Sequence, residues 1–285
     1  MDSQAPAIID LNAEAAKLTM FRGRTPQTTF AECKGSVARL GSYRDGILLL
    51  GKSAGGKGHW ETHPEDELLH VLDGARTLDI VERDGPRSYA VGAGMIVIVP
   101  AGAWHRVRSE VAGTVMSATI PGEHIDLDVG DPRPHVRTSS VERQLASRSP
   151  SIIDLGQELA KLTMFRRTPQ ATAADRKGSV AQLAPYRDGL LLAIKASGKD
   201  HWERHLTGDE LVHILDGSAT LEIVCDDGPP QSFALRAGMV AVIPQSAWHR
   251  LLSTEGATQV AVTPFPGETL EVDVDDPRTV QHKPA

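Results

Sequence analysis

Histidine and glutamate alternate in two short stretches of the chain. The first stretch is HWETH, from His59 to His63, and the second is HWERH, from His201 to His205. Residues two apart in a β-strand project from the same face, so the histidines and the glutamate of each stretch would share one face. Imidazole nitrogens and carboxylate oxygens bind divalent transition metals. The same alternation is also typical of the solvent face of a half-buried strand, so the stretches alone leave both interpretations open.

Further polar residues follow both stretches in the same order. Glu67 and then His105 come after the first stretch, and Glu210 and then His249 come after the second. The added glutamate and histidine favour a functional site over a solvated strand face. Two copies of one polar arrangement indicate two copies of one site.

The repetition extends over both halves of the chain. The segment KLTMFR from Lys17 to Arg22 recurs from Lys161 to Arg166, and the segment YRDG from Tyr43 to Gly46 recurs from Tyr186 to Gly189. The offset between matching residues drifts by only a few positions, as expected for small gaps in turns. A repeat of roughly 140 residues has the size of an ordinary domain, so we expect a duplicated domain and not a solenoid array.

Composition excludes several classes of protein. The chain is 40% hydrophobic and 24% charged, and it lacks the run of roughly 20 apolar residues that spans a bilayer. A net charge of -7 without a basic cluster argues against nucleic acid and membranes as partners. Cys33 and Cys225 are not equivalent in the two repeats, which argues against a duplicated disulfide or thiolate metal site. Met1 to Gln4 does not resemble a secretory signal, so we expect a cytoplasmic protein.

Each repeat is predicted to open with one short helix and to continue in short strands. Asp10 to Leu18 and Asp154 to Leu162 each begin with a residue that caps helices and continue with good helix formers. Strand patterns separated by turn signals follow in the first repeat at Val37 to Leu40, Ile47 to Leu50, Glu67 to Leu72, Thr77 to Val81, Met95 to Val99 and Thr114 to Thr119. Many short strands at even spacing predict an all-β sandwich or jelly-roll barrel.

A segment rich in Ser and Arg separates the two repeats. It is bounded by Pro134 and Pro150 and lacks a sustained apolar alternation. We therefore expect a first domain over residues 1–133, a linker over 134–150 and a second domain over 151–285.

Two spaced motifs make each repeat resemble the cupins, and the chain resembles their two-domain form, the bicupins. In the first motif a glutamate stands seven residues before a glycine, as Glu67 does before Gly74 and Glu210 before Gly217. A His-x-His pair precedes that glutamate by three or four residues, and His63 and His205 hold the second histidine position. The second motif is a glycine, five residues, Pro-x-Gly, two residues and a histidine. The first repeat matches it fully up to His105, whereas the second repeat has Ser246 in place of the second glycine.

The resemblance implies two tandem double-stranded β-helices with one divalent metal ion in each. The chain departs from the family where Glu61 and Glu203 replace the usual first histidine. Two imidazoles and two carboxylates suit Fe(II), Mn(II), Zn(II) or Ni(II). The metal ligands that the resemblance implies, with this departure, are Glu61, His63, Glu67, His105, Glu203, His205, Glu210 and His249.

Other residues near the motifs have structural interpretations. His59 and His201 are alternative candidate ligands, but they lie outside the family pattern, so we expect them to contact a ligand residue or solvent. His70 and His213 fall on the opposite strand face and are predicted to pack in the core or to form a hydrogen bond between the sheets. The tryptophans beside the candidate ligands are predicted to be core residues too. Glu65, Asp66 and Asp209 look like solvated turn residues, although a shifted register would make one of them a ligand. The tryptophans are Trp60, Trp104, Trp202 and Trp248.

Two classes of function fit the resemblance. The first is a metal-dependent enzyme acting on a small organic molecule, for which we consider a dioxygenase before an isomerase or a lyase. The second is a non-catalytic bicupin that senses or stores a metal or a small ligand. The sequence assigns no catalytic residue and no organic cofactor. A chain with two cupin domains is compatible with both a monomer and a homodimer.

Overall fold

The computed structural model describes residues 5–137, 148–225 and 228–280 and divides into two compact units. The N-terminal unit comprises Ala13–Gly156, and the C-terminal unit comprises Met1–Asn12 together with Gln157–Ala285. These units differ from the expected domains 1–133 and 151–285. Residues 138–147 of the expected linker lie outside the described residues.

The boundaries differ because each unit takes its first strand from the other repeat. Strand β1 (Ala7–Asp10) pairs antiparallel with β20 (Met239–Ile243) in the C-terminal unit. In the same way, β13 (Ser151–Asp154) pairs with β9 (Met95–Val99) in the N-terminal unit. Each exchanged strand packs one partly buried isoleucine against the core that receives it, Ile8 in the C-terminal unit and Ile152 in the N-terminal unit.

A short helix follows each exchanged strand, as the sequence predicted. Helix α1 is Leu11–Lys17, and α3 is Leu155–Ala160. The side chain of Asp10 accepts a hydrogen bond of 3.1 Å from the backbone N–H of Asn12. This bond satisfies one of the N–H groups that the start of a helix leaves without a partner, which is why Asp10 marks the helix start.

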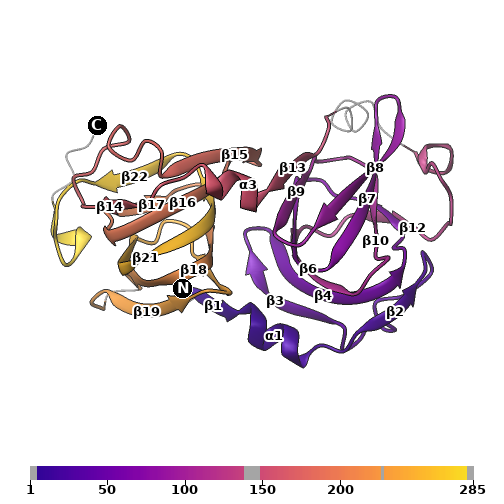
Figure 1. Ribbon diagram of the computed structural model, residues 1–285, viewed down its shortest axis with the longest axis horizontal. Helices are drawn as coiled ribbons and strands as arrows, with labels where there is room; N and C mark the ends of the chain where they lie inside the picture. Colours follow the sequence, from indigo (N-terminus) through magenta and orange to yellow (C-terminus); the bar gives the residue numbers. More distant parts are fainter. Residues whose placement is uncertain (1–4, 138–147, 226–227, 281–285) are drawn as a thin grey trace. The chain divides into compact units, whose positions relative to one another are not determined.

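Two sheets make up the N-terminal unit (Figure 1). The first has the order β13-β9-β6-β11-β4-β2, and β3 pairs with β4 at its side. The second has the order β12-β5-β10-β7-β8. The bounds are β2 Phe21–Arg24, β3 Val37–Tyr43, β4 Gly46–Gly56, β5 Trp60–Thr62, β6 Glu67–Asp73, β7 Ala75–Glu82, β8 Gly85–Gly92, β10 His105–Arg108, β11 Gly113–Thr119 and β12 Glu123–Ile125, with a 3₁₀ turn η1 at Arg133–His135.

The C-terminal unit has a matching strand order in one continuous sheet. Two long strands, β18 and β21, each cover the length that two strands cover in the N-terminal unit, so the two layers are joined. Strand β18 shifts register twice along its pairing with β21, which lets it bend from one layer into the other. The bounds are β14 Phe165–Arg167, β15 Val180–Tyr186, β16 Gly189–Lys199, β17 Trp202–His205, β18 Glu210–Ile223, β19 Gln231–Arg236, β21 His249–Pro264, β22 Gly267–Leu270 and η2 Pro277–Thr279.

The six strands predicted for the first repeat are confirmed as parts of β3, β4, β6, β7, β9 and β11. Alternating apolar residues of these strands form the core of the unit, with Leu78 and Ile80 of β7 almost fully buried. Strand β8 was not predicted, because it opens with Gly85-Pro86 and is mostly exposed. It lies at the edge of its sheet, where a proline without an N–H group is tolerated.

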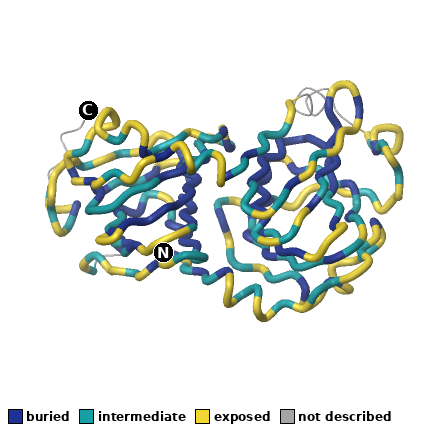
Figure 2. The backbone as a smooth tube through the Cα atoms, in the orientation of Figure 1, coloured by how far each residue is buried: buried dark blue, intermediate teal, exposed yellow. Residues whose placement is uncertain are grey.

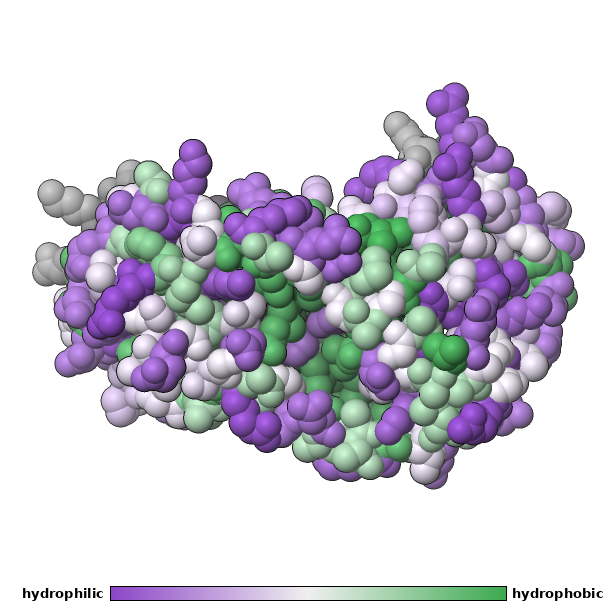
Figure 3. Space-filling view, viewed as in Figure 1, coloured by the Kyte–Doolittle hydropathy of each residue, from purple (hydrophilic) through white to green (hydrophobic). Residues whose placement is uncertain are grey.

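In each unit the strands and the loops differ in burial. The strands of each unit carry most of its buried residues, whereas the loops are largely exposed (Figure 2). Hydrophilic side chains gather over the end of the hairpin β7–β8 (Figure 3). Among the described residues, no helix is long and apolar enough to cross a membrane.

Candidate metal sites

Each unit brings its four candidate residues to the inner face of its strands. In the N-terminal unit Glu61 lies on β5, His63 follows that strand, and Glu67 and His105 are the first residues of β6 and β10. The pairing register places His105 directly opposite Glu61. We call Glu61, His63, Glu67 and His105 the first site and Glu203, His205, Glu210 and His249 the second site.

The first site is centred on a short contact between His105 and Glu67. The Nε2 atom of His105 lies 2.9 Å from Oε2 of Glu67, and Nε2 of His63 lies 3.7 Å from the same oxygen. The carboxylate of Glu61 is 4.0 Å from both histidine Nε2 atoms. Ligand atoms of Glu61, His63 and His105 all lie within 4.8 Å of one another, whereas Glu67 falls outside that group of three.

The second site gathers all four candidate residues. Ligand atoms of Glu203, His205, Glu210 and His249 lie within 4.8 Å of one another. The Nε2 atom of His249 is 2.9 Å from Oε2 of Glu210, and Nε2 of His205 is 3.5 Å from the same oxygen. Glu203 lies opposite His249 in the strand register, as Glu61 lies opposite His105.

A threonine distinguishes the two glutamates at the centre of the sites. In the second site the hydroxyl of Thr263 donates a hydrogen bond of 2.6 Å to Oε1 of Glu210. The matching Thr119 instead donates to the backbone carbonyl of Ile120, at 3.4 Å. Glu210 is therefore held by a neighbour that Glu67 lacks.

Backbone carbonyls orient one histidine of each site. The Nδ1 atom of His105 lies 3.1 Å from the carbonyl oxygen of Ala103, and Nδ1 of His249 lies 3.0 Å from that of Ala247. A proton on Nδ1 that is donated to a carbonyl leaves the lone pair of Nε2 free for a metal. The same arrangement orients many histidine ligands in metalloproteins.

The other histidine of each site has buried nitrogens without hydrogen-bond partners. Neither ring nitrogen of His63 or of His205 makes a hydrogen bond within the described part of the chain. Leaving such atoms unpaired in the interior costs free energy. A divalent ion in each site would satisfy the Nε2 atoms, so the residues fit the metal that the sequence predicted.

Neighbouring charges in the two sites shift the pKa values of Glu61, His105 and His205. Burial raises the pKa of Glu61, but the hydrogen bond from His59 and the charge of His105 outweigh it and lower the pKa to about 2. Burial lowers the pKa of His105, but the hydrogen bond and charge of Glu67 raise it to about 9. In the second site, burial likewise lowers the pKa of His205, but Glu210 raises it to about 9.

His59 and His201 each support the glutamate two residues further along the chain. The Nε2 atom of His59 lies 3.3 Å from Oε2 of Glu61, and Nε2 of His201 lies 3.4 Å from Oε2 of Glu203. Of the two roles expected for these histidines, contact with a candidate ligand residue or with solvent, the structure shows the first. They orient the glutamates that replace the histidine of the family pattern.

The core interpretations of the other histidines and of the tryptophans hold. His70 and His213 are buried, and burial lowers the pKa of His213 to about 4. Trp60 and Trp202 are fully buried, and each indole N–H donates to a backbone carbonyl far along the chain, that of Val129 or Val274. Trp104 and Trp248 pack in the same two clusters.

The expectation that Asp66 is a solvated turn residue is wrong. Asp66 is buried, and its carboxylate accepts hydrogen bonds of 2.8 Å from the N–H of Ala101 and from Arg148. Asp209 accepts a hydrogen bond of 3.0 Å from the N–H of Gln245 in the matching loop. The two aspartates bond to the loops that precede His105 and His249, and neither belongs to a candidate metal group.

That loop contains the turn glycine of the second motif. Gly102 has φ 73° and donates its N–H to the carbonyl of His63, at 2.8 Å. Ser246 adopts the same left-handed conformation, with φ 65°, and donates to the carbonyl of His205 at 2.8 Å. Ser246 therefore keeps the backbone hydrogen bond that Gly102 makes. Its left-handed conformation is strained, because serine has a Cβ atom.

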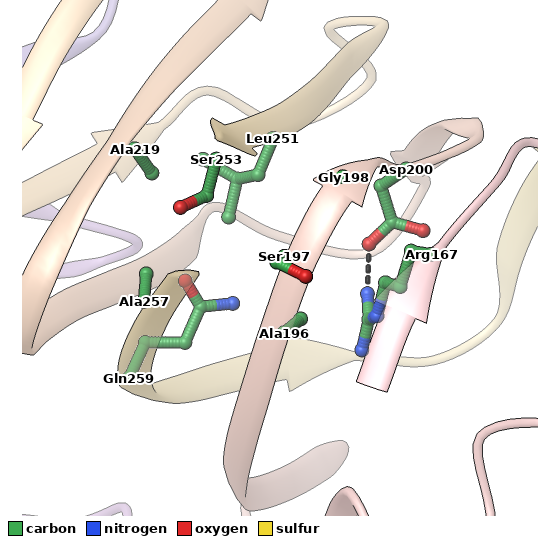
Figure 4. Close-up of a pocket in the computed structure, with 10 residues that line it drawn as sticks. All are labelled: Arg167, Ala196, Ser197, Gly198, Asp200, Ala219, Leu251, Ser253, Ala257 and Gln259. Carbon is green, nitrogen blue, oxygen red and sulfur yellow. Dashed lines mark hydrogen bonds and ion pairs between the residues drawn. The ribbon is translucent and has the colours of Figure 1, made fainter. Parts of the chain in front are cut away.

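A buried ion pair beside the second site was not predicted. The guanidinium of Arg167, on β14, pairs with the carboxylate of Asp200, which follows β16 (Figure 4). The pair borders a small pocket that is also lined by Ser197, Ser253 and Gln259 (Figure 4). Strand β14 is only three residues long and carries no strong strand pattern, so nothing in the sequence indicated that it lies beside the site.

Comparisons with known proteins agree with this architecture. Residues 52–131 match the family model of the cupin domain, so this part of the N-terminal unit has the features of the cupin superfamily. Among curated proteins, no sequence matches the chain.

Solved structures share the fold at low sequence identity. A cupin 2 conserved barrel domain protein from Leptotrichia buccalis is 12% identical, with a TM-score of 0.54 over 93% of this chain and 98% of that chain. A mutant of the oxalate decarboxylase of Bacillus subtilis is also 12% identical, with a TM-score of 0.50 over 82% of this chain and 74% of that chain. Identities this low show the shared fold alone.

Proposed function

We propose that the chain is a bicupin that binds one divalent transition metal ion in each unit and acts on a small organic molecule. The observation that carries the proposal is the second site, where two histidines and two carboxylates converge within 4.8 Å of one another. The first site supports it with three such residues and with His63 nitrogens that no described residue satisfies. The two carboxylates of each site would neutralise a divalent ion.

Among metal-dependent reactions we propose a dioxygenase first. A bound divalent ion would polarise oxygen atoms of a ligand and, if redox-active, would react with dioxygen. The protein's own part is carried by Glu61 and Glu203. These are the most exposed members of the sites, at 31% and 28% of the side chain, so they are the carboxylates that a ligand would meet. Each could bind the metal or accept a proton from the ligand.

Metal stoichiometry tests the first part of the proposal. Protein purified without a histidine tag and saturated with Fe(II), Mn(II), Zn(II) or Ni(II) should hold two ions per chain by elemental analysis. Replacing His63 and His205 together with alanine should reduce the content to well below one, whereas replacing the exposed His135 should not change it. One ion per chain at saturation, or none, would overturn the assignment of two sites.

Oxygen uptake tests the reaction class. The metal-loaded protein should consume dioxygen with at least one member of a panel of diketones, hydroxybenzoates and flavonols. Absence of uptake across the panel, with two redox-active ions bound, would contradict the dioxygenase and leave a non-catalytic bicupin or a lyase.

A further inference from the structure

The two sites differ at the residue directly before the His-Trp pair that occurs in each repeat. Gly58 stands in this place in the N-terminal unit, and Asp200 stands in it in the C-terminal unit. Each residue faces an arginine from a short strand. Arg24 of β2 pairs in register with Gly56, and the matching Arg167 of β14 pairs with Gly198. One arginine therefore meets a carboxylate and the other meets a glycine.

In the C-terminal unit the arginine is neutralised inside the protein. Arg167 and Asp200 form an ion pair whose side chains are both 7% exposed, and Figure 4 shows the two groups turned toward each other. Asp200 also lies 3.3 Å from Nδ1 of His201, whose other nitrogen contacts Glu203. Burial lowers the pKa of Arg167 to about 10, while the charges of Glu203 and Glu210 oppose that shift. The arginine thus lies within electrostatic reach of the second site.

In the N-terminal unit the arginine has no such partner. The Cζ and Nε atoms of Arg24 lie 3.6 and 3.8 Å from the position that a Cβ atom on Gly58 would take. Its Nε atom is buried and makes no hydrogen bond, and the structure gives its guanidinium no ion pair with any described residue. A guanidinium stays charged at every physiological pH, so a buried N–H without an acceptor is costly.

Arg24, which forms no ion pair with the described residues, lies beside the residue that precedes His59. Its guanidinium covers Gly58, the neighbour of His59, and His59 contacts Glu61 through Nε2 at 3.3 Å. A planar guanidinium matches a carboxylate with two parallel hydrogen bonds. An organic acid that pairs with Arg24 would therefore lie beside His59, which contacts Glu61 of the first site.

We infer that Arg24 binds the carboxylate of an organic acid ligand at the first site, and that Asp200 fills the equivalent place in the second site. This inference rests on the proposed function, because it names the chemical class of the small molecule that would bind at the first site. It makes the two units unequal, since only the N-terminal unit offers a cation to an incoming acid. The second site would bind a neutral ligand together with the metal, or the metal alone.

Calorimetric titration of the full chain with malonate tests the inference, with the neutral malonamide as the matched ligand. We expect one malonate per chain and at least tenfold weaker binding of malonamide, in keeping with the usual contribution of a charge-assisted hydrogen bond. Arg24→Gln should weaken malonate binding at least tenfold. Arg22→Gln is the control, because Arg22 lies on the same strand but is exposed.

Gly58→Asp provides an independent variant, because it installs the carboxylate that the second repeat carries. A Cβ atom on Gly58 would make only ordinary contacts, so the aspartate fits beside Arg24. It should weaken malonate binding as Arg24→Gln does. Equal binding of malonate by wild type and Arg24→Gln, or of malonate and malonamide by wild type, would overturn the inference. Inorganic phosphate that binds Arg24 more tightly than malonate would overturn the assignment to an organic acid.

Metal analysis on the same samples separates this inference from the proposed function. The titrations are made with metal-loaded and with chelator-treated protein. If no metal binds at all, the proposed function fails, while a difference between wild type and Arg24→Gln in chelator-treated protein would still support the anion site. If metal binds normally and the variants bind malonate as tightly as wild type does, the anion site is refuted and the proposed function is not.

Discussion

Nε2 of His249 lies 2.9 Å from Oε2 of Glu210, and this contact recurs at the same distance between His105 and Glu67. Without a metal, a protonated histidine and an ionised glutamate form a buried ion pair. A metal ion would take the place of the proton, because the same two atoms are its candidate ligands. Both sites are therefore built so that protons and metal ions compete for one position.

Removing the charge of Glu61 and Glu203 tests whether they bind the metal. Glu61→Gln together with Glu203→Gln keeps the size of the side chains and should lower metal affinity by more than the roughly 10- to 100-fold typical of residues that only support a ligand. Glu65→Gln, an exposed change in the next turn, is the control. Normal metal binding with lost turnover would instead make the glutamates bases. Unchanged binding and turnover would exclude both roles.

The threonine contact predicts an asymmetric effect. Thr263→Val removes the 2.6 Å hydrogen bond to Glu210 and should weaken metal binding at the second site by roughly 10-fold or more. Thr119→Val should leave the first site unchanged, because the Thr119 hydroxyl contacts a backbone carbonyl and not Glu67. Competition titrations against a chelator resolve the two sites. Equal losses in the two variants would contradict the structure.

Metal affinity should rise with pH. The pKa values of His105 and His205 are raised from 6.5 to about 9, so below about pH 9 each histidine must lose a proton before it binds a metal. We expect the apparent affinity to rise between pH 6.5 and 9 and to level off above, by about tenfold per pH unit for each displaced proton. Titrations in buffers of different ionisation enthalpy count the released protons. A metal affinity that does not change between pH 6.5 and 9 would refute the competition between protons and metal ions.

The metal-free protein should show the opposite trend. A histidine whose pKa is raised on folding stabilises the fold below its unfolded pKa, and the stabilisation is lost as pH rises through the folded pKa. The unfolding temperature of chelator-treated protein should therefore fall between pH 6.5 and 9. His135→Ala should behave like wild type, whereas His105→Ala with His205→Ala should remove most of the dependence.

The left-handed serine predicts a stabilising substitution. Ser246→Gly relieves a conformation that costs about 1 kcal/mol or more in a residue with a Cβ atom, so it should raise the free energy of unfolding by up to about 1 kcal/mol. Gly102→Ser, the reverse change in the other repeat, should lower it by a similar amount. Denaturant titration measures both. The prediction fails if Ser246→Gly lowers stability.

Fragments test the exchange of the first strands. Residues 1–146 contain β1 but lack β13, and the two strands have almost the same sequence, Ala7 to Asp10 and Ser151 to Asp154. In such a fragment β9 has an open edge that β1 of a second copy can fill, so we expect a dimer. Residues 13–156 carry their own β13 and should be monomeric by light scattering. A monomeric 1–146 fragment with a melting temperature equal to that of 13–156 would contradict this.

The sequence by itself determined the local features of the sites. Strand alternation placed Glu61 and His63 on one face and Trp60 on the other, because the side-chain period of a strand does not depend on its neighbours. The duplicated spacing of Glu67 and His105 indicated that both would join them. The helix start at Asp10 followed from capping, which is equally local.

Only the tertiary structure decided what surrounds those residues. Three contacts join segments that are far apart in the chain. Strand β1 pairs with β20, the Thr263 hydroxyl donates to Glu210, and Arg24 lies against Gly58. The matching Thr119 makes no such bond to Glu67. Such contacts depend on which strands pair and in which register, and the repeat pattern is the same whichever repeat receives the strand. The sequence therefore predicted two similar sites, and the packing of distant strands around them made the sites different.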